Sequence, residues 1–217
     1  MRGYLLLALL IVLFIGSLVV FGTTAFRRGP TPTNPESVVV GGSRPSLTEP
    51  RITFIDPVRG NPNASITIVE FGDYFCEFCA QIEPVVAEVL ARYPRDARLV
   101  WKDFPNDYLH QNASRAAEAA RCAGETGKYW EYHDLLFARA GSTALISFES
   151  LAETVGIDRE AFTTCLESGR MRPRVELTGE EARGLGITGV PFFFINGEPF
   201  HGSTLEEFTT AINAPRN

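Results

Sequence analysis

The sequence predicts an α/β domain that is interrupted by a block of helices and preceded by a hydrophobic helix long enough to cross a membrane. Three observations predict this fold class: strand patterns alternate with helices at both ends of the domain, five helical patterns follow one another between them, and residues 4–21 carry no charge. The chain has 217 residues, 45% of them hydrophobic and 21% charged, which suits one globular domain with a short appendage.

The hydrophobic segment is expected to be a transmembrane anchor at residues 4–22, after a short tail at residues 1–3. At a rise of 1.5 Å per residue, its uncharged part spans roughly 27 Å, close to the hydrocarbon thickness of a bilayer. Thr23-Thr24-Ala25 also fits a cleavage site, so a cleaved signal peptide is the alternative. Residues 23–50 are rich in proline and glycine without hydrophobic periodicity, which predicts an extended linker to a domain at residues 51–217.

The first half of the domain is expected to alternate between strands and a helix. Strand patterns at residues 52–55 and 65–71 are separated by a turn at 57–63. Residues 66–69 are all β-branched, as in a buried central strand. A helix at residues 83–92 and a strand at 98–102 follow.

The second half of the domain begins with a helical insertion at about residues 106–185. Its helices are expected at residues 112–124, 128–139, 148–155, 159–167 and 174–185. A strand at residues 190–195, a turn at Gly197, a further strand and a helix at 204–212 complete the domain.

The motif Cys76-Glu77-Phe78-Cys79 follows a strand and opens a helix. A thiol at a helix N-terminus faces unpaired backbone N–H groups and the positive end of the helix dipole, which stabilise its thiolate. Because the thiolate is the attacking species in disulfide exchange, the motif predicts a redox pair with Cys76 as nucleophile and Cys79 as resolving thiol. A zinc site is the alternative, although Cys122 and Cys165 lack the spacing of further zinc ligands; two inert buried thiols are another.

A carboxyl group is expected near this pair. Glu70 interrupts an apolar strand, so it should be buried with a raised pKa and should exchange protons with Cys79; a solvent-facing side chain is the alternative. Lys102, in the neighbouring strand pattern, either pairs with Glu70 or is solvated.

A peptide-binding edge is expected at Gly189-Val190-Pro191. Proline cannot donate a ladder hydrogen bond at the start of a buried strand, so its position needs an explanation. A cis bond between Val190 and Pro191 would leave the backbone of Val190 free to pair with a peptide. Tyr74 or Phe78 is expected to rim the same groove.

Several segments together are similar to one known family. They are residues 70–79 (Glu-Phe-Gly-Asp-Tyr-Phe-Cys-Glu-Phe-Cys), residues 189–191, residues 56–62 (Asp-Pro-Val-Arg-Gly-Asn-Pro), residues 119–123 and residues 128–134. They resemble the DsbA-like thiol–disulfide oxidoreductases, and the resemblance covers residues 52–213. It implies a thioredoxin-like fold with an inserted all-helical subdomain, with Cys76 as nucleophile, Cys79 as resolving thiol, Glu70 as buried acid and Pro191 as cis-proline.

The resemblance also implies a setting and partners. We expect a single-pass protein of the cell membrane, held there by its N-terminal helix, with its catalytic domain on the extracytoplasmic side, in the periplasm or cell envelope. Reduced exported proteins would be its substrates, and a DsbB- or VKOR-like membrane protein would be its redox partner. No cofactor and no metal are expected. Nucleic acid is not expected either, because a net charge of −6 repels phosphate.

The direction of electron flow is open at this stage. An oxidase of exported proteins is expected, a reductase fed by a membrane electron donor is the alternative, and a redox-inert or zinc-stabilised peptide-binding module is the third reading. The strong oxidases of the family resemble Cys-Pro-His-Cys, whereas Glu77 and Phe78 stand between the cysteines here. The charge of Glu77 should oppose a neighbouring thiolate and make the disulfide less oxidising.

Cys122 and Cys165 are expected on different helices of the insertion. In an oxidising compartment they would form a structural disulfide, which in the chain-entropy model contributes about 4 kcal/mol. Two free buried thiols and a second redox relay are the alternatives.

Overall fold

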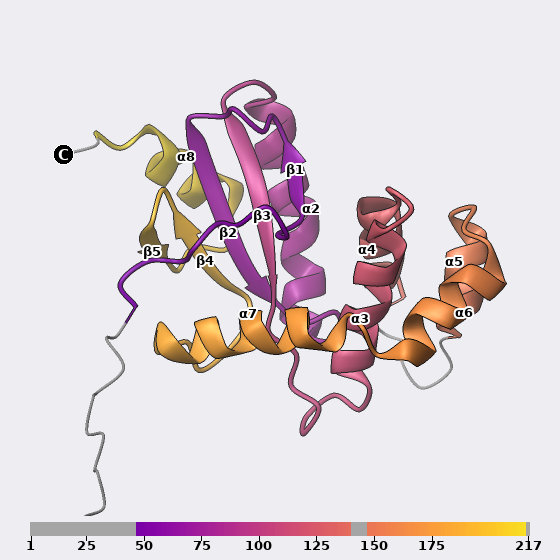
Figure 1. The fold of residues 1–217 in the computed structure, drawn as a ribbon. Coiled ribbons are helices and arrows are strands. Elements are labelled where there is room, and N and C mark those ends of the chain that lie inside the picture. Colours follow the sequence, from indigo (N-terminus) through magenta and orange to yellow (C-terminus); the bar gives the residue numbers. More distant parts are fainter. Residues whose placement is uncertain (1–46, 140–146, 216–217) are drawn as a thin grey trace, which may run out of the picture. The chain divides into compact units, whose positions relative to one another are not determined.

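The computed structural model describes residues 47–139 and 147–215 (Figure 1). The anchor expected at residues 4–22 lies outside the described residues, as does nearly all of the expected linker. Within the part that is described, no helix combines the length and the apolar character that a membrane span requires.

Among the described residues, five strands form one mixed sheet in the order β1-β3-β2-β4-β5. The central strand β2 (Ile66–Gly72) runs parallel to β3 (Ala97–Asp103) and antiparallel to β4 (Phe192–Ile195). The edges are the antiparallel strands β1 (Val58–Gly60) and β5 (Glu198–Phe200). This arrangement places the end of β2, from which the Cys76–Cys79 segment continues, in the middle of the sheet.

Helices cover both faces of the sheet. Helices α2 (Glu77–Arg92) and α8 (Leu205–Asn213) pack on the face that carries Ile68 and Leu99. Helix α7 (Arg172–Gly184) packs through Ala182 on the opposite face, against alternate residues of the same strands. The thioredoxin-like α/β architecture expected from the sequence is therefore present.

The helical insertion lies between β3 and α7. It consists of α3 (Ala113–Gly124), α4 (Tyr129–Phe137), α5 (Phe148–Thr154) and α6 (Arg159–Ser168), which gather to one side of the sheet in Figure 1. The apolar core of the insertion is continuous with the residues around Cys79, so the insertion also buries the redox pair.

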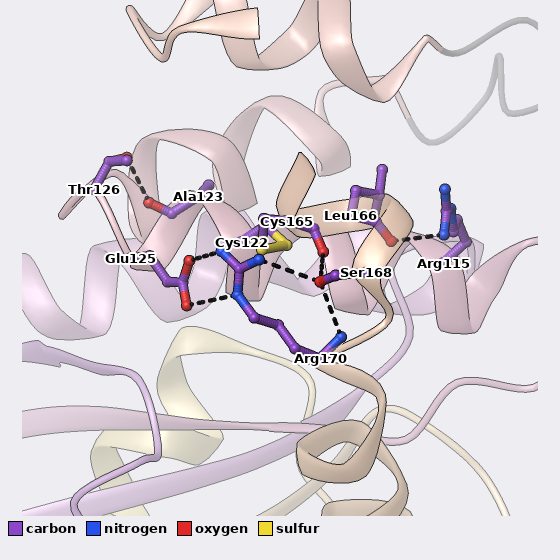
Figure 2. The surroundings of a disulfide bond; sticks show 9 residues. All are labelled: Arg115, Cys122, Ala123, Glu125, Thr126, Cys165, Leu166, Ser168 and Arg170. Carbon is purple, nitrogen blue, oxygen red and sulfur yellow. Dashed lines mark hydrogen bonds and ion pairs between the residues drawn. A yellow bond between two sulfur atoms is a disulfide. The ribbon is translucent and has the colours of Figure 1, made fainter. Parts of the chain in front are cut away.

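A disulfide joins α3 to α6 through Cys122 and Cys165, whose Cα atoms are 5.9 Å apart. Figure 2 shows its surroundings, where Arg170 pairs with Glu125 at 2.5 Å and contacts Ser168. Both cysteines are at most 3% exposed. The disulfide thus cross-links the interior of the insertion.

The strand predicted at residues 52–55 is wrong. The Asp56 carboxylate accepts hydrogen bonds from the backbone N–H and the hydroxyl of Thr53 at 2.7 and 2.9 Å, and these bonds bend the segment into a turn. The edge strand lies instead at β1, inside the predicted turn. It ends at Gly60, where φ is +96° and a Cβ atom would lie 2.8 Å from the Ala97 carbonyl oxygen, so glycine suits the position best.

Candidate active site

Cys76 is the N-cap residue of α2, which begins at Glu77, six residues before the helix expected from the sequence. A hydrogen bond from the Cys79 thiol, together with backbone N–H groups of Cys79 and Phe78, lowers the pKa of Cys76 to about 6 despite its burial. The Asp73 carboxylate opposes this shift. Cys76 is therefore mostly a thiolate at neutral pH.

Cys79 has the opposite character. It is 0% exposed, and its interaction with Cys76, its burial and the nearby Glu70 carboxyl all raise its pKa far above the ordinary value. Both cysteines are free thiols in this structure. One thiol is thus ready to attack, while its neighbour retains its proton.

Glu70 lies on β2 and is fully buried. Neither of its carboxyl oxygens has a hydrogen-bond partner among the described residues. Burial raises the pKa of Glu70 well above its usual value, and repulsion from Glu83 adds to this while Arg59 opposes it. Its surroundings therefore favour the protonated, neutral form of this carboxyl group.

Lys102 neither pairs with Glu70 nor is solvated. Glu70 is opposite Trp101 in the parallel register, whereas Lys102 is opposite Phe71, so the two side chains project from opposite faces of the sheet. The Lys102 amine is buried 2.9 Å from Asp56 and 3.0 Å from Glu181.

A groove of about 520 Å³ lies beside the redox pair. It is lined in part by Phe78, Ile82, Val190, Pro191, Phe200 and Ser203. The Val190–Pro191 peptide bond is cis, and the Val190 carbonyl oxygen lies 3.5 Å from Cys76 Sγ. Phe78 is 70% exposed and forms part of the wall. The arrangement brings a groove lined by both apolar and polar residues beside the Cys76 sulfur.

Of the residues expected to contact a substrate, three lie at or next to the groove and one does not. Val190 and Phe78 line the groove, and Gly189, the residue before Val190 in the sequence, is exposed. The expectation for Tyr74 is wrong, because this side chain is 1% exposed, stacks on Trp101 and bonds the Tyr129 hydroxyl at 2.9 Å. An aromatic residue between a strand and a helix can face either way, and here the insertion supplies the aromatic neighbours that draw it inward.

Asp73 is a site residue that the sequence interpretation missed. Its carboxylate accepts a hydrogen bond from the backbone N–H of Phe75 at 2.8 Å and contacts the His110 ring at 2.9 Å. An aspartate whose side chain bonds the N–H two residues later is a recognisable turn signal, and it was available directly before Cys76. The contact with His110 had no local signal, because 37 residues separate the two.

The four cysteines are one set of potential metal ligands, and a cluster of histidine and carboxylate side chains is another. The disulfide between Cys122 and Cys165 removes the cysteines that a zinc site at Cys76 and Cys79 would have recruited. Within the described ranges, a cluster of potential ligand atoms occurs at Glu83, His133 and Asp134, all within 4.8 Å of one another. Arg59 lies 2.5 Å from the Asp134 carboxylate, so a cationic side chain already occupies this place.

The solved structures that are similar to this chain share its fold. A thioredoxin-like oxidoreductase from Silicibacter pomeroyi is 27% identical with a TM-score of 0.64, and the match covers 78% of this chain and 95% of that one. BdbD from Bacillus subtilis is 20% identical with a TM-score of 0.68, covering 76% and 94%. The thiol-disulfide exchange protein alpha-DsbA2 from Wolbachia pipientis is 23% identical with a TM-score of 0.66, covering 74% and 87%.

Curated relatives carry a different name. A protein named Na(+)/H(+) antiporter NhaA 1, from Salinispora arenicola, is 37% identical over 160 residues, which are 73% of this chain and 24% of that protein. A protein named Na(+)/H(+) antiporter NhaA 3, from Salinispora tropica, is 36% identical over 158 residues. The chain spans about a quarter of the length of these relatives.

The family comparison covers most of the chain. A family model described as thioredoxin matches residues 54–214, a range that contains the cysteine pair, the groove and the helical insertion. The three solved structures support the same fold. The chain therefore belongs to the thioredoxin family.

Proposed function

We propose that the chain is a membrane-tethered, extracytoplasmic thiol–disulfide oxidoreductase that oxidises exported proteins through a Cys76–Cys79 disulfide. The observation that carries this proposal is the contrast between the two thiols, with a pKa of about 6 at Cys76 and a strongly raised pKa at Cys79. A stabilised thiolate at Cys76 favours the reduced protein, and a protein that is stable when reduced is a good oxidant.

The reaction begins when a substrate thiolate attacks Cys76 Sγ of the oxidised protein. A mixed disulfide forms, the Cys76–Cys79 bond breaks, and Cys79 leaves as a thiolate that takes a proton from Glu70. A second substrate thiolate then attacks the substrate sulfur of the mixed disulfide and releases Cys76 as a thiolate. The substrate loses two electrons, which the protein now holds as the reduced pair.

Glu77, the acidic residue between the two cysteines, lies at the surface of α2. Its exposed carboxylate accepts a hydrogen bond from Gln81 at 3.1 Å, one turn along the helix. The carboxylate that raises the pKa of Cys76 is that of Asp73. That Glu77 makes the disulfide less oxidising stays a prediction, which the reduction potential tests.

The setting and the domain boundaries belong to the same proposal. The anchor is placed at residues 4–22, the linker at 23–50 and the thioredoxin domain at 51–217. The expected insertion at about residues 106–185 contains α3 to α6 and also α7, which packs on the sheet. The uncharged hydrophobic run supports the anchor. Exported proteins with reduced thiols would dock in the groove beside Val190, and a DsbB- or VKOR-like membrane protein would reoxidise the pair.

The reduction potential of the Cys76–Cys79 couple tests this function. The full chain is equilibrated in glutathione buffers, and the fraction of disulfide is measured after acid quenching. We expect a potential closer to about −120 mV than to the thioredoxin value of about −270 mV. A potential near the thioredoxin value would favour a reductase, and the absence of a titratable couple would leave a peptide-binding module.

A further inference from the structure

Protons must move between Cys79 and solvent during each catalytic cycle, yet no direct route is open. Cys79 and Glu70 are both 0% exposed. Lys102, the basic side chain on the neighbouring strand, lies on the opposite face of the sheet with Asp56 and Glu181. Glu70 can exchange a proton with Cys79, but it then needs a group that returns it to its starting state.

A row of three ionisable side chains leads from Glu70 towards the surface: Glu83, His133 and Asp134. Glu83 belongs to α2 and carries the charge that acts most strongly on Glu70, while His133 and Asp134 belong to α4. The His133 side chain is fully buried, whereas the Asp134 side chain is 55% exposed. The row thus begins beside the redox pair and ends in solvent.

The His133 ring presents a different nitrogen to each neighbour. Nδ1 lies 3.1 Å from Asp134 Oδ1, and Nε2 lies 3.9 Å from Glu83 Oε1. Neither Nε2 nor Glu83 Oε1 has a hydrogen-bond partner among the described residues, and both atoms are buried. Because the Asp134 carboxylate can only accept, Nδ1 carries the hydrogen, and the lone pair of Nε2 faces Glu83.

The protonation states fit transfer between these atoms. Burial raises the pKa of Glu83 to about 8, so this carboxyl group holds its proton at pH 7. Burial lowers the pKa of His133, so the ring is neutral. Burial alone would raise the pKa of Asp134, but hydrogen bonds from His133 and Arg59 hold it below its usual range. A carboxylic acid therefore faces an unprotonated nitrogen, and that ring is in turn bonded to a carboxylate.

The surrounding groups fix this row in place. Arg59 of β1 binds Asp134 at 2.5 Å and stacks over the Trp130 ring at 4.3 Å. Edge-to-face aromatic contacts hold the His133 ring, with centroids 4.8 Å from Trp101 and Trp130. The other ionisable groups that act on His133 or pack against its ring are Asp103 of β3, Tyr74 and Tyr129.

We propose that Glu83, His133 and Asp134 carry the proton that Glu70 exchanges with Cys79 to and from the surface. When the dithiol is reoxidised, Glu83 gives its proton to Nε2 of His133, and Nδ1 releases its own proton to Asp134 and solvent. The Glu83 carboxylate then takes the proton of Glu70, and the Glu70 carboxylate that results takes the proton of Cys79. Each step moves one proton and no electrons, and substrate oxidation reverses the direction. The proposal rests on the proposed redox function of the same site.

The test isolates the step in which Cys79 must lose its proton. The reduced full chain is mixed with excess oxidised glutathione, quenched with acid at increasing times and analysed by mass spectrometry. The thiolate of Cys76 first forms a glutathione adduct, and Cys79 then displaces glutathione to form the protein disulfide. The second step does not depend on glutathione concentration, so its rate is measured separately across a range of pH.

In Glu83→Gln we expect this second step to slow by about tenfold or more at pH 7, with a shifted pH profile and an unchanged first step. A purely electrostatic role predicts little change at pH 7, where Glu83 holds its proton, and a faster second step above about pH 8, where removing the charge of Glu83 favours ionisation of Glu70. Asp134→Asn, at a half-exposed position, should slow the step less. Glu88→Gln, an exposed glutamate of the same helix, and Glu131→Gln, an exposed glutamate of α4, are the matched controls and should behave as wild type.

The outcomes separate the relay from the proposed function. If the wild-type chain forms no glutathione adduct or no disulfide, the redox function itself fails. If exchange proceeds while Glu83→Gln and Asp134→Asn resolve the adduct at the wild-type rate or faster, the relay is wrong and the redox function stands. His133→Gln is a further variant, and its result counts only where its thermal unfolding matches that of wild type.

Discussion

The Asp73 carboxylate ties the segment before Cys76 to the loop after β3, through a 2.9 Å contact between its Oδ2 atom and Nδ1 of His110. The same oxygen accepts a hydrogen bond from the backbone N–H of Asn106 at 2.9 Å. Asp73 is 1% exposed, so water screens its charge weakly. The carboxylate therefore positions the nucleophile's loop and also opposes the negative charge on Cys76.

Replacing this carboxylate should make Cys76 more acidic. In Asp73→Asn we expect the pKa of Cys76 to fall below 6, by up to about 1 unit, because a nearby negative charge is removed. The ultraviolet absorbance of the thiolate, measured against pH, gives this value. Asp107→Asn is the control, since Asp107 lies in the loop after β3, next to Asn106, but bonds Ser114 instead of the segment before Cys76. An unchanged or higher pKa in Asp73→Asn would contradict the electrostatic role.

Glu83 should make the protein less stable as pH rises. Its folded-state pKa of about 8 lies above the unfolded value of about 4.3, so the folded state binds more protons between these two pH values. Stability attributable to this group is complete below about pH 4.3 and falls towards pH 8, with a slope of at most about 1.4 kcal/mol per pH unit. Glu83→Gln removes this pH-dependent loss. The free energy of unfolding of the variant, relative to that of wild type, should therefore increase from about pH 4.3 to about pH 8. Urea unfolding at several pH values measures it, and a constant difference would argue against the raised pKa.

Removal of the Cys122–Cys165 disulfide should cost stability without loss of exchange. The double variant Cys122→Ser with Cys165→Ser opens a loop with a sequence separation of 43, for which the chain-entropy model gives about 4 kcal/mol. Denaturant unfolding measures the loss. Exchange with oxidised glutathione should be unchanged under conditions where the variant is folded. A large loss of exchange there would indicate a second redox relay instead of a structural cross-link.

Substitution of the resolving thiol should trap substrates. In Cys79→Ala the mixed disulfide at Cys76 cannot be released by Cys79, so adducts with thiol-containing proteins should accumulate and disappear on reduction. Non-reducing electrophoresis shows them. Cys76→Ala is the matched control and should form none. Equal trapping by both variants, or by neither, would count against Cys76 as the nucleophile.

The chemistry of the site was more predictable than its three-dimensional contacts. The cysteine pair, its position at a helix N-terminus and the burial of Glu70 follow from patterns within about ten residues. The face of the sheet on which Lys102 lies could not be predicted in this way. Its strand is buried on both faces, so apolar and polar residues do not alternate along the sequence and do not reveal the register. A shift of one residue in the pairing of β2 with β3 would place Lys102 on the face of Glu70. In the observed register Lys102 lies on the other face, where it pairs with Asp56 and Glu181.

The inward position of Tyr74 and the Glu83–His133 contact were hidden for a related reason. Both depend on how the inserted helices pack against the start of α2, and the contacting residues are far apart in sequence. Local patterns predict that a helix exists and which face is apolar, but they do not specify which residue of another helix it meets. The turn at Asp56 could have been predicted locally, because an aspartate that can bond nearby backbone favours a turn. The predicted strand rested instead on the β-branched residues before it.

The buried cross-link between α3 and α6 has a consequence for the protein's own maturation. Before the insertion folds, Cys122 and Cys165 are reduced thiols in a newly made polypeptide, the same kind of group that the proposed activity oxidises. Once folded, both cysteines are buried, with at most 3% of each exposed. Under the proposed activity, each new chain would start as a substrate of the reaction and end as a catalyst of it, so finished copies would speed the production of further ones.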